Sequence, residues 1–189
     1  MSIIFITGGI KSGKSSFALN IFNKNYNSYS SDNRFFIATM IQFDDETKNK
    51  IEKHKYEREN LNLKNLKLIE EPLYIDKVIE NLPDSSIVLL DCITIWLNNF
   101  LYYFTENIDI NECNFEIIEK KVLEKVKKIE KFIKKGLFIV VSNEVNLGNV
   151  PFDKLTRNYN LILGNINKYI ASISDEVYFM VSGIPLKIK

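Results

Sequence analysis

The chain has 189 residues, 46% of them apolar, which is long enough to bury a full core as a single domain over residues 1–189. Its 25 Lys and Arg residues against 24 Asp and Glu residues argue against a broad nucleic-acid interface. The longest apolar runs, such as residues 87–97, are too short or too interrupted to span a bilayer, and residues 1–7 lack the pattern of a signal peptide. We therefore expect a cytoplasmic protein, in which Cys92 and Cys113 are ordinary thiols.

Short apolar runs alternate along the chain with longer helical patterns. This alternation is typical of an α/β protein with a mostly parallel central sheet and helices on both faces. The runs are continuously apolar, as expected for strands that are covered on both sides. The predicted strands are residues 3–7, 34–40, 86–91, 136–142 and 176–182, with a short edge strand at 185–189; the predicted helices are 14–23, 44–59, 72–81, 93–104, 112–135 and 153–173; and the predicted loops are 23–33 and 59–67.

The segment GGIKSGKS stands between the first predicted strand and the first predicted helix. It satisfies the P-loop pattern G-x-x-x-x-G-K-[ST] in the context that this pattern requires, whereas an ordinary glycine turn matches it only rarely by chance. Glycines let main-chain N–H groups turn inward, and the start of a helix adds positive charge, so such a turn cradles phosphate. The sequence therefore predicts an NTP-binding P-loop, a P-loop NTPase-like fold, and a nucleotide site formed by Gly8, Gly9, Ile10, Lys11, Ser12, Gly13, Lys14 and Ser15.

Two residues of this turn have predicted chemical roles. Lys14 is expected to reach the outer phosphates as a catalytic residue, and the Ser15 hydroxyl is expected to bind Mg²⁺. P-loop proteins also need a carboxylate at the end of a neighbouring buried strand to orient the metal, and Asp91 ends the run SIVLLD. Ser15 and Asp91 are thus the predicted metal-binding residues. For Lys11, an anion contact and a solvated loop position both stay open.

The charged pattern at residues 44–58 carries the only histidine of the chain, His54. A neutral imidazole nitrogen is nucleophilic near neutral pH, although a single histidine on a charged helix can also be a solvated surface residue. Residues 115–135 place apolar side chains at three- and four-residue spacing opposite Lys and Glu, which favours an outer helix packed on the sheet over a partner-binding helix. After the run at 136–142, Asn143 and Glu144 have either a site role or a role in local loop hydrogen bonding.

Six blocks of sequence follow one another in the order known from one family. The chain resembles the bifunctional adenosylcobinamide kinase/adenosylcobinamide-phosphate guanylyltransferases of cobalamin biosynthesis, and the resemblance covers its whole length. The blocks are TGGIKSGKS (7–15), FIATMIQFDDE (36–46), KIEKHKYER (50–58), IEEP (69–72), DCITIWLNNF (91–100) and VSNEVNLGNVP (141–151), and the tail GIPLKIK (183–189) also fits.

The chain departs from the family pattern in a few places. Lys11 stands where the family usually has Arg, and Asn146 and Asn149 replace a Gly and an apolar residue. The block at 157–168 keeps Arg157, Gly164 and Asn167 and loses the family's Asp and Gln. The changes within residues 146–168 bear on the corrinoid side and on loop geometry, and they leave the nucleotide side intact.

The resemblance implies two reactions. In the first, ATP or GTP phosphorylates adenosylcobinamide; in the second, GMP passes from GTP through a guanylylated histidine to adenosylcobinamide phosphate, which yields adenosylcobinamide-GDP. It implies His54 as the catalytic histidine and Glu70 as the guanine contact, although Glu70 can also be an exposed charge. It further implies GTP, ATP and Mg²⁺ as cofactors, a homo-oligomer with a trimer as one candidate, and nucleotide contacts from Ala38, Thr39, Met40, Lys55, Tyr56, Glu57 and Arg58.

Two other functions stay open. A small P-loop metabolite kinase without guanylyl transfer explains Lys14, Ser15 and Asp91 but gives His54 no role. A regulator that binds GTP without turning it over is the other alternative, and the altered region 146–168 leaves room for it.

Overall fold

A seven-stranded sheet forms the centre of the protein, as seen in a computed structural model that describes residues 2–41, 65–132, 136–148 and 150–189. The strand order is β3-β2-β4-β5-β1-β6-β7, and among these pairs only β6 and β7 are antiparallel. The strands are β1 (Ser2–Gly8), β2 (Arg34–Ala38), β3 (Lys67–Glu70), β4 (Ser86–Asp91), β5 (Gly136–Val141), β6 (Glu176–Val181) and β7 (Ile184–Lys187). The described helices are α1 (Lys14–Tyr26), α3 (Ile75–Glu80), α4 (Ile93–Thr105), α5 (Phe115–Phe132) and α6 (Lys154–Ile173), with a 3₁₀ turn at Ser31–Asn33.

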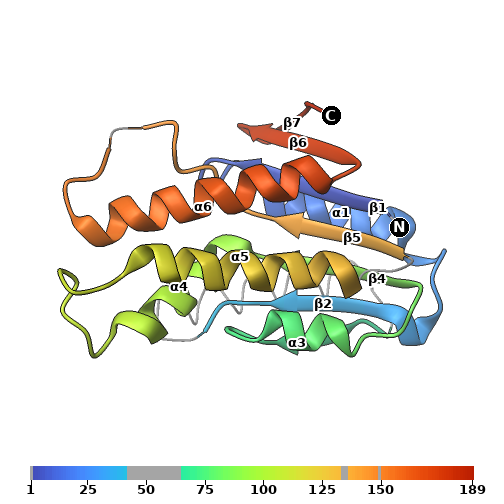
Figure 1. The fold of residues 1–189 in the computed structure, drawn as a ribbon. Helices are drawn as coiled ribbons and strands as arrows, with labels where there is room; N and C mark the ends of the chain where they lie inside the picture. The colour runs from blue at the N-terminus through green and yellow to red at the C-terminus, as the bar shows by residue number, and fades with distance from the viewer. Residues whose placement is uncertain (1, 42–64, 133–135, 149) are drawn as a thin grey trace.

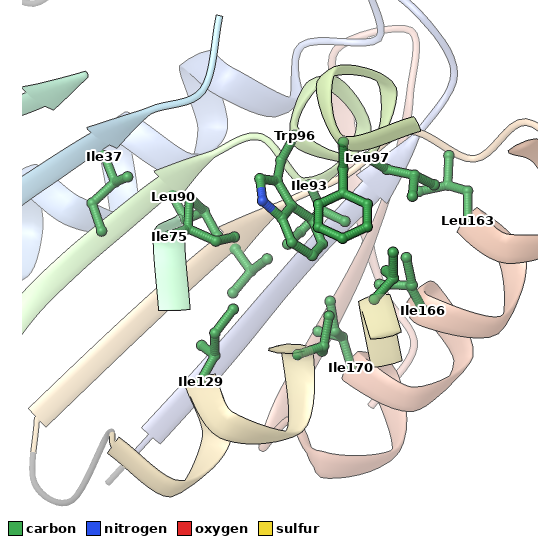
Figure 2. Packing of buried hydrophobic residues seen from close by; sticks show 14 of the residues in the cluster. Ile37, Ile75, Leu90, Ile93, Trp96, Leu97, Ile129, Leu163, Ile166 and Ile170 are labelled. Carbon is green, nitrogen blue, oxygen red and sulfur yellow. The ribbon is translucent and has the colours of Figure 1, made fainter. Parts of the chain in front are cut away.

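Helices cover both faces of this sheet, as the sequence predicts (Figure 1). In β1, Ile4 and Ile6 pack with α1 on one face, whereas Ile3 and Phe5 pack with the helices of the other face, because successive side chains of a strand point to opposite sides. This second face carries α3, α4, α5 and α6. Figure 2 shows the fully buried Trp96 of α4 among aliphatic side chains of β4, α3, α5 and α6. Among the described residues, no helix has the length and apolar content that crossing a bilayer requires.

The sequence predictions differ from the structure at β3. Residues 59–67 are predicted as a loop and no strand is predicted at 67–70, yet Lys67–Glu70 pairs in parallel with β2. Most side chains of this strand are exposed, so its sequence has little apolar periodicity. Backbone pairing with β2 at the edge of the sheet stabilises it instead of side-chain burial.

Three helices also have different bounds from those predicted. Helix α5 begins at Phe115 and not at residue 112. Helix α1 continues to Tyr26, into the predicted loop, because the buried Tyr26 ring has two packing partners. Its centroid lies 5.6 Å from that of Phe22, and Cζ of Arg34 lies 4.0 Å above it. Helix α3 begins at Ile75 and not at residue 72, because the Glu71 carboxylate accepts hydrogen bonds from the backbone N–H groups of Leu73 and Tyr74. The predicted helix at 44–59 lies outside the described residues.

The parallel register brings several predicted site residues to one edge of the sheet. Ala38 at the end of β2 is opposite Glu70 of β3 on one side and Asp91 of β4 on the other. The sequence predicts that Asp91 lies on the strand next to the P-loop strand β1. This prediction is wrong, because β5 lies between β4 and β1 and places Asp91 one strand further away. Strand order is set by tertiary packing, and the motif spacing does not reveal it.

Replacing Gly136 should destabilise the fold. Gly136 has φ 141°, and a Cβ there would lie 2.1 Å from the backbone oxygen of Ser86 on β4. We expect Gly136→Ala to lower the free energy of unfolding by about 2–4 kcal/mol, measured by urea denaturation. Gly148→Ala is the matched control, because a Cβ at Gly148 meets nothing within 4 Å. Equal stability of the two variants would contradict this assignment.

Candidate nucleotide site

The P-loop turn depends on two glycines in conformations that other residues rarely adopt. Gly8 has φ 144° and Gly13 has φ 93°. A Cβ at Gly8 would lie 2.6 Å from the backbone oxygen of Met180, and one at Gly13 would lie 3.2 Å from Cα of Gly183. The backbone N–H of Gly183 donates to the oxygen of Ser12 at 3.0 Å. The turn between β6 and β7 therefore packs directly on the P-loop, a contact that the sequence analysis does not anticipate.

The N-terminus of α1 is open to an anion. The helix begins at Lys14, its N-cap is Gly13, and no side chain caps it. Its first turn also contains no acidic residue. The uncapped N–H groups and the positive end of the helix dipole are thus free to act on phosphate oxygens. This geometry supports the phosphate cradle that the motif predicts.

The Lys14 side chain is folded back into the turn. Its Nζ donates to the backbone oxygen of Gly9 at 2.6 Å and lies 3.5 Å from Oγ of Ser12. Burial lowers the pKa of Lys14, and the negative charge of Asp91 acts in the opposite direction. The ammonium is therefore in a partly desolvated place near the Asp91 carboxylate, where an incoming phosphate would be a stronger partner than the Gly9 carbonyl.

The residues that follow β5 connect the P-loop to the start of α4. The backbone N–H of Glu144 donates to the oxygen of Gly8 at 3.0 Å. The backbone N–H of Asn143 donates to Oγ1 of Thr94, at the start of α4, at 2.6 Å, and this Oγ1 lies 3.3 Å from Oγ of Ser142. Thr94 and Ser142 lie within the sequence blocks 91–100 and 141–151, but their residue types alone do not predict this contact.

Asn143 and Glu144 have two predicted roles, one at the site and one in local loop hydrogen bonding. The Glu144 carboxylate accepts from the backbone N–H of Asn146 at 2.9 Å, and the Asn143 oxygen accepts from Nδ2 of Asn167 at 2.9 Å. Local loop hydrogen bonding is thus present at both residues. Their backbone lies between the P-loop and β4, so a role at the site stays a prediction.

The altered loop is accommodated by a small residue on α6. Nδ2 of Asn146 donates to the oxygen of Asn160 at 3.2 Å, and a Cβ at Gly164 would lie 2.4 Å from this Nδ2. Gly164 therefore provides the space that the Asn146 side chain uses. Asn149 lies outside the described residues.

Thr39 holds the ends of β2 and β4 together. Its hydroxyl donates to the oxygen of Cys92 at 2.8 Å and accepts from the Cys92 N–H at 2.9 Å, while its own N–H donates to the oxygen of Asp91 at 3.1 Å. The residue is fully buried. Burial raises the pKa of the Cys92 thiol to about 12, and the negative charge of Asp91 also raises it, so the reactive thiolate form is disfavoured at neutral pH. Thr39 offers no exposed atom to a nucleotide here, whereas Ala38 and Met40 beside it are half-buried.

Of the remaining predicted site residues, some lie within the described part of the chain and others outside it. Glu70 is exposed at the end of β3, opposite Ala38, and the backbone N–H of Glu71 donates to the Ala38 oxygen at 2.9 Å. Ser15 is half-buried in the first turn of α1, and Ile10 and Lys11 are exposed. Outside the described residues lie His54, Lys55, Tyr56, Glu57 and Arg58.

Comparison with known families decides the affiliation of the chain. The family described as "Cobinamide kinase / cobinamide phosphate guanyltransferase" matches residues 4–188. The chain belongs to this family. The family match covers the P-loop, β4 with Asp91 and the C-terminal hairpin, and it confirms the resemblance inferred from the six blocks.

Curated relatives from this family match over almost their whole length. "Bifunctional adenosylcobalamin biosynthesis protein CobU" of Escherichia coli (strain K12) is 29% identical over 190 residues, which cover 99% of this chain and 99% of that protein. "Bifunctional adenosylcobalamin biosynthesis protein CobP" of Pseudomonas aeruginosa is 30% identical over 185 residues, which cover 97% of this chain and 95% of that protein. Both names describe bifunctional proteins of adenosylcobalamin biosynthesis.

A solved structure confirms the fold class. The flagellar accessory protein FlaH from Methanocaldococcus jannaschii matches with a TM-score of 0.54 and 14% identity, over 100% of this chain and 78% of that one. At this identity the likeness concerns the fold alone. The chain has the P-loop NTPase-like α/β architecture that the sequence predicts, with a mostly parallel sheet between two helical layers.

Removing the Lys14 ammonium should weaken triphosphate binding. Lys14→Met keeps the aliphatic stem in its buried place but removes the charge that faces the turn, so we expect the affinity for GTP to fall about 10- to 100-fold, measured by isothermal titration calorimetry. Lys24→Met, at the exposed end of the same helix, is the matched control and should bind GTP like the unmodified chain. A GTP affinity that is unchanged in Lys14→Met would contradict the phosphate cradle.

Proposed function

We propose that the chain phosphorylates adenosylcobinamide with ATP or GTP and then transfers GMP from GTP to adenosylcobinamide phosphate through a guanylylated His54. The product of the second reaction is adenosylcobinamide-GDP. The observation that carries the proposal is a P-loop with an uncapped helix N-terminus in a chain that matches the cobinamide kinase/guanyltransferase family from residue 4 to 188.

In the kinase step, a hydroxyl of adenosylcobinamide attacks the γ-phosphorus, and the nucleoside diphosphate leaves. The N–H groups of residues 9–14 and the Lys14 ammonium would stabilise the negative charge on the phosphate oxygens. The buried position of Lys14 strengthens this interaction because little water competes for the ammonium.

In the guanylyltransferase step, a neutral ring nitrogen of His54 attacks the α-phosphorus of GTP, and pyrophosphate leaves. The phosphoramidate that forms is labile enough to pass GMP to the phosphate of the corrinoid, which restores the free imidazole. Arg58 comes four residues after His54 and would share its face of the predicted helix. Lys55 directly follows His54, and both cations would hold phosphates or the ribose. Tyr56 and Glu57 complete the proposed nucleotide contacts from this segment.

Magnesium fits the residues at the P-loop. Mg²⁺ is usually held by one or two protein oxygens together with substrate phosphates and water, and Ser15 and Asp91 supply a hydroxyl and a carboxylate. The described residues contain no cluster of three or more His, Cys, Asp or Glu side chains, so a cage made only of protein ligands has no support in that part of the chain. When bound, the ion would neutralise phosphate charge; Ser15 would contact it directly and Asp91 would act through water.

Guanine selectivity is assigned to Glu70. A carboxylate accepts hydrogen bonds from the N1–H and N2–H₂ groups of guanine, which adenine lacks. The exposed position of Glu70 at the carboxyl end of β3, opposite Ala38, is compatible with this contact.

We further propose that the enzyme works in the cytoplasm as a homo-oligomer, with a trimer as the candidate state, and binds no nucleic acid. The free thiols Cys92 and Cys113 support a reducing compartment. The near-zero net charge of +1 argues against nucleic acid. Exposed Ile184, Leu186 and Ile188 on the edge hairpin support association between copies, which sedimentation equilibrium would measure.

Labelling with α-³²P-GTP tests the guanylyltransferase. We expect label that survives denaturation, is released by acid as expected for a phosphorus–nitrogen bond, and is absent in His54→Ala. Addition of adenosylcobinamide phosphate should discharge the label from the unmodified chain.

The same experiment separates the alternatives. A P-loop kinase without guanylyl transfer would transfer the γ-phosphate to adenosylcobinamide and never acquire label. A GTP-binding regulator would release no pyrophosphate when adenosylcobinamide phosphate is present. Label that persists in His54→Ala would contradict the assignment of the nucleophile.

A further inference from the structure

Two buried side chains of α4 donate hydrogen bonds into the edge of the sheet where the base contacts are proposed. Nε1 of Trp96 donates to the oxygen of Leu73 at 3.0 Å, and Nδ2 of Asn99 donates to the oxygens of Thr39 at 2.8 Å and Pro72 at 3.3 Å. Trp96 is fully buried and Asn99 is 4% exposed. Residues three apart lie on one face of a helix, so both side chains act on the same region.

The Asn99 amino group joins two chain segments that have just left the sheet. Thr39 directly follows β2, and Pro72 comes two residues after the end of β3. The last contacts of the ladder are the pairing of Ala38 with Glu70 and the hydrogen bond from Glu71 N–H to the Ala38 oxygen. Beyond that point the two segments are free to separate, and Asn99 uses its two amide hydrogens to keep them at a fixed distance.

The oxygen of the Asn99 amide is in a less favourable environment than its nitrogen. Oδ1 of Asn99 is buried, and among the described residues it has no hydrogen-bond partner. A buried carbonyl without a partner is unfavourable, so the residue satisfies two backbone oxygens at the expense of its own. Its structural effect is a defined separation of the β2 and β3 ends.

We infer that Asn99 is a positioning residue for guanine selectivity, because it fixes the Glu70 segment relative to Ala38 and Met40. The inference rests on the proposed function, in which Glu70 contacts guanine and the neighbouring Ala38 and Met40 are expected nucleotide contacts. Asn99 itself is buried behind Thr39 and Pro72 and acts through them.

The sheet order separates this effect from phosphate binding. Strands β4 and β5 lie between β2 and the P-loop strand β1. The P-loop is held by its own contacts, through Gly183 to Ser12 and Glu144 to Gly8. Loosening the β2 and β3 ends should therefore weaken the contacts that distinguish guanine from adenine, and leave the phosphate contacts that GTP and ATP share.

The test compares Asn99→Asp with Asn98→Asp. Both substitutions replace an amide by a carboxylate on the same helix. Asn98 is exposed, so its carboxylate would be solvated. In Asn99→Asp, both amide donors are lost and the carboxylate would be repelled by the two backbone oxygens that they bonded. Dissociation constants for GTP and ATP are measured by calorimetry. We expect Asn99→Asp to lower the preference for GTP over ATP about tenfold, in the range of one lost hydrogen bond, with the ATP constant unchanged. Asn98→Asp should keep the preference.

Further variants keep the test decisive. Asn99→Ser, which also loses the two-carbonyl bridge, replaces Asn99→Asp if thermal unfolding shows that the aspartate variant does not fold. Glu70→Gln tests the base contact directly. If Glu70→Gln lowers the GTP preference while folded Asn99 variants keep it, the positioning role is overturned and the proposed function stands. If the unmodified chain binds GTP and ATP equally, the guanine contact of Glu70 and the positioning role of Asn99 are both contradicted, whereas guanylyl transfer through His54 is tested separately by the labelling with α-³²P-GTP.

Discussion

Close contact between the P-loop and the C-terminal hairpin is the constraint on which the site depends. Gly8 and Gly13 adopt positive φ angles where the turn packs against Met180 and Gly183: a Cβ would lie 2.6 Å from the Met180 oxygen at Gly8 and 3.2 Å from Cα of Gly183 at Gly13. The hydrogen bond from Gly183 to Ser12 closes the same contact. Because the turn is fixed in this way, α1 starts at Lys14 with its N–H groups uncapped, and Lys14 is held inside the turn. From these backbone positions we predict a phosphate site at this edge of the sheet.

The order of the parallel strands places the proposed phosphate, metal and base contacts at different positions along one edge of the sheet. Strand β1 supplies the phosphate cradle, β4 supplies Asp91, and β2 and β3 supply the proposed base contacts. In such sheets ligands bind at the carboxyl ends of the strands. Strand β5 lies between β1 and β4. The residues after it donate to the Gly8 oxygen and to the Thr94 hydroxyl at the start of α4, so these bonds connect the proposed phosphate cradle with the segment that follows Asp91.

Sequence reasoning predicts the parts of this arrangement that have a local signal. The P-loop is found because its glycines and lysine have fixed spacing. Strands β1, β2, β4 and β5 are found because both of their faces are apolar and buried, and β6 is found from its apolar run although it is only partly buried. Strand β3 is missed because its exposed side chains give no periodicity, and the place of Asp91 one strand further from β1 depends on tertiary packing. Thr39 is expected as a nucleotide contact, but its hydroxyl is used by Cys92. Asn99 looks like an ordinary polar helix residue until its two carbonyl partners are seen.

A crystal structure with a non-hydrolysable GTP analogue would test the central claim most directly, namely that the glycine turn binds the triphosphate. The account predicts phosphate oxygens within hydrogen-bond distance of the backbone N–H groups of residues 9–14. It also predicts that Nζ of Lys14 leaves the Gly9 oxygen, 2.6 Å away here, for a phosphate oxygen. An analogue bound elsewhere, with the bond between Lys14 and Gly9 intact, would contradict the account.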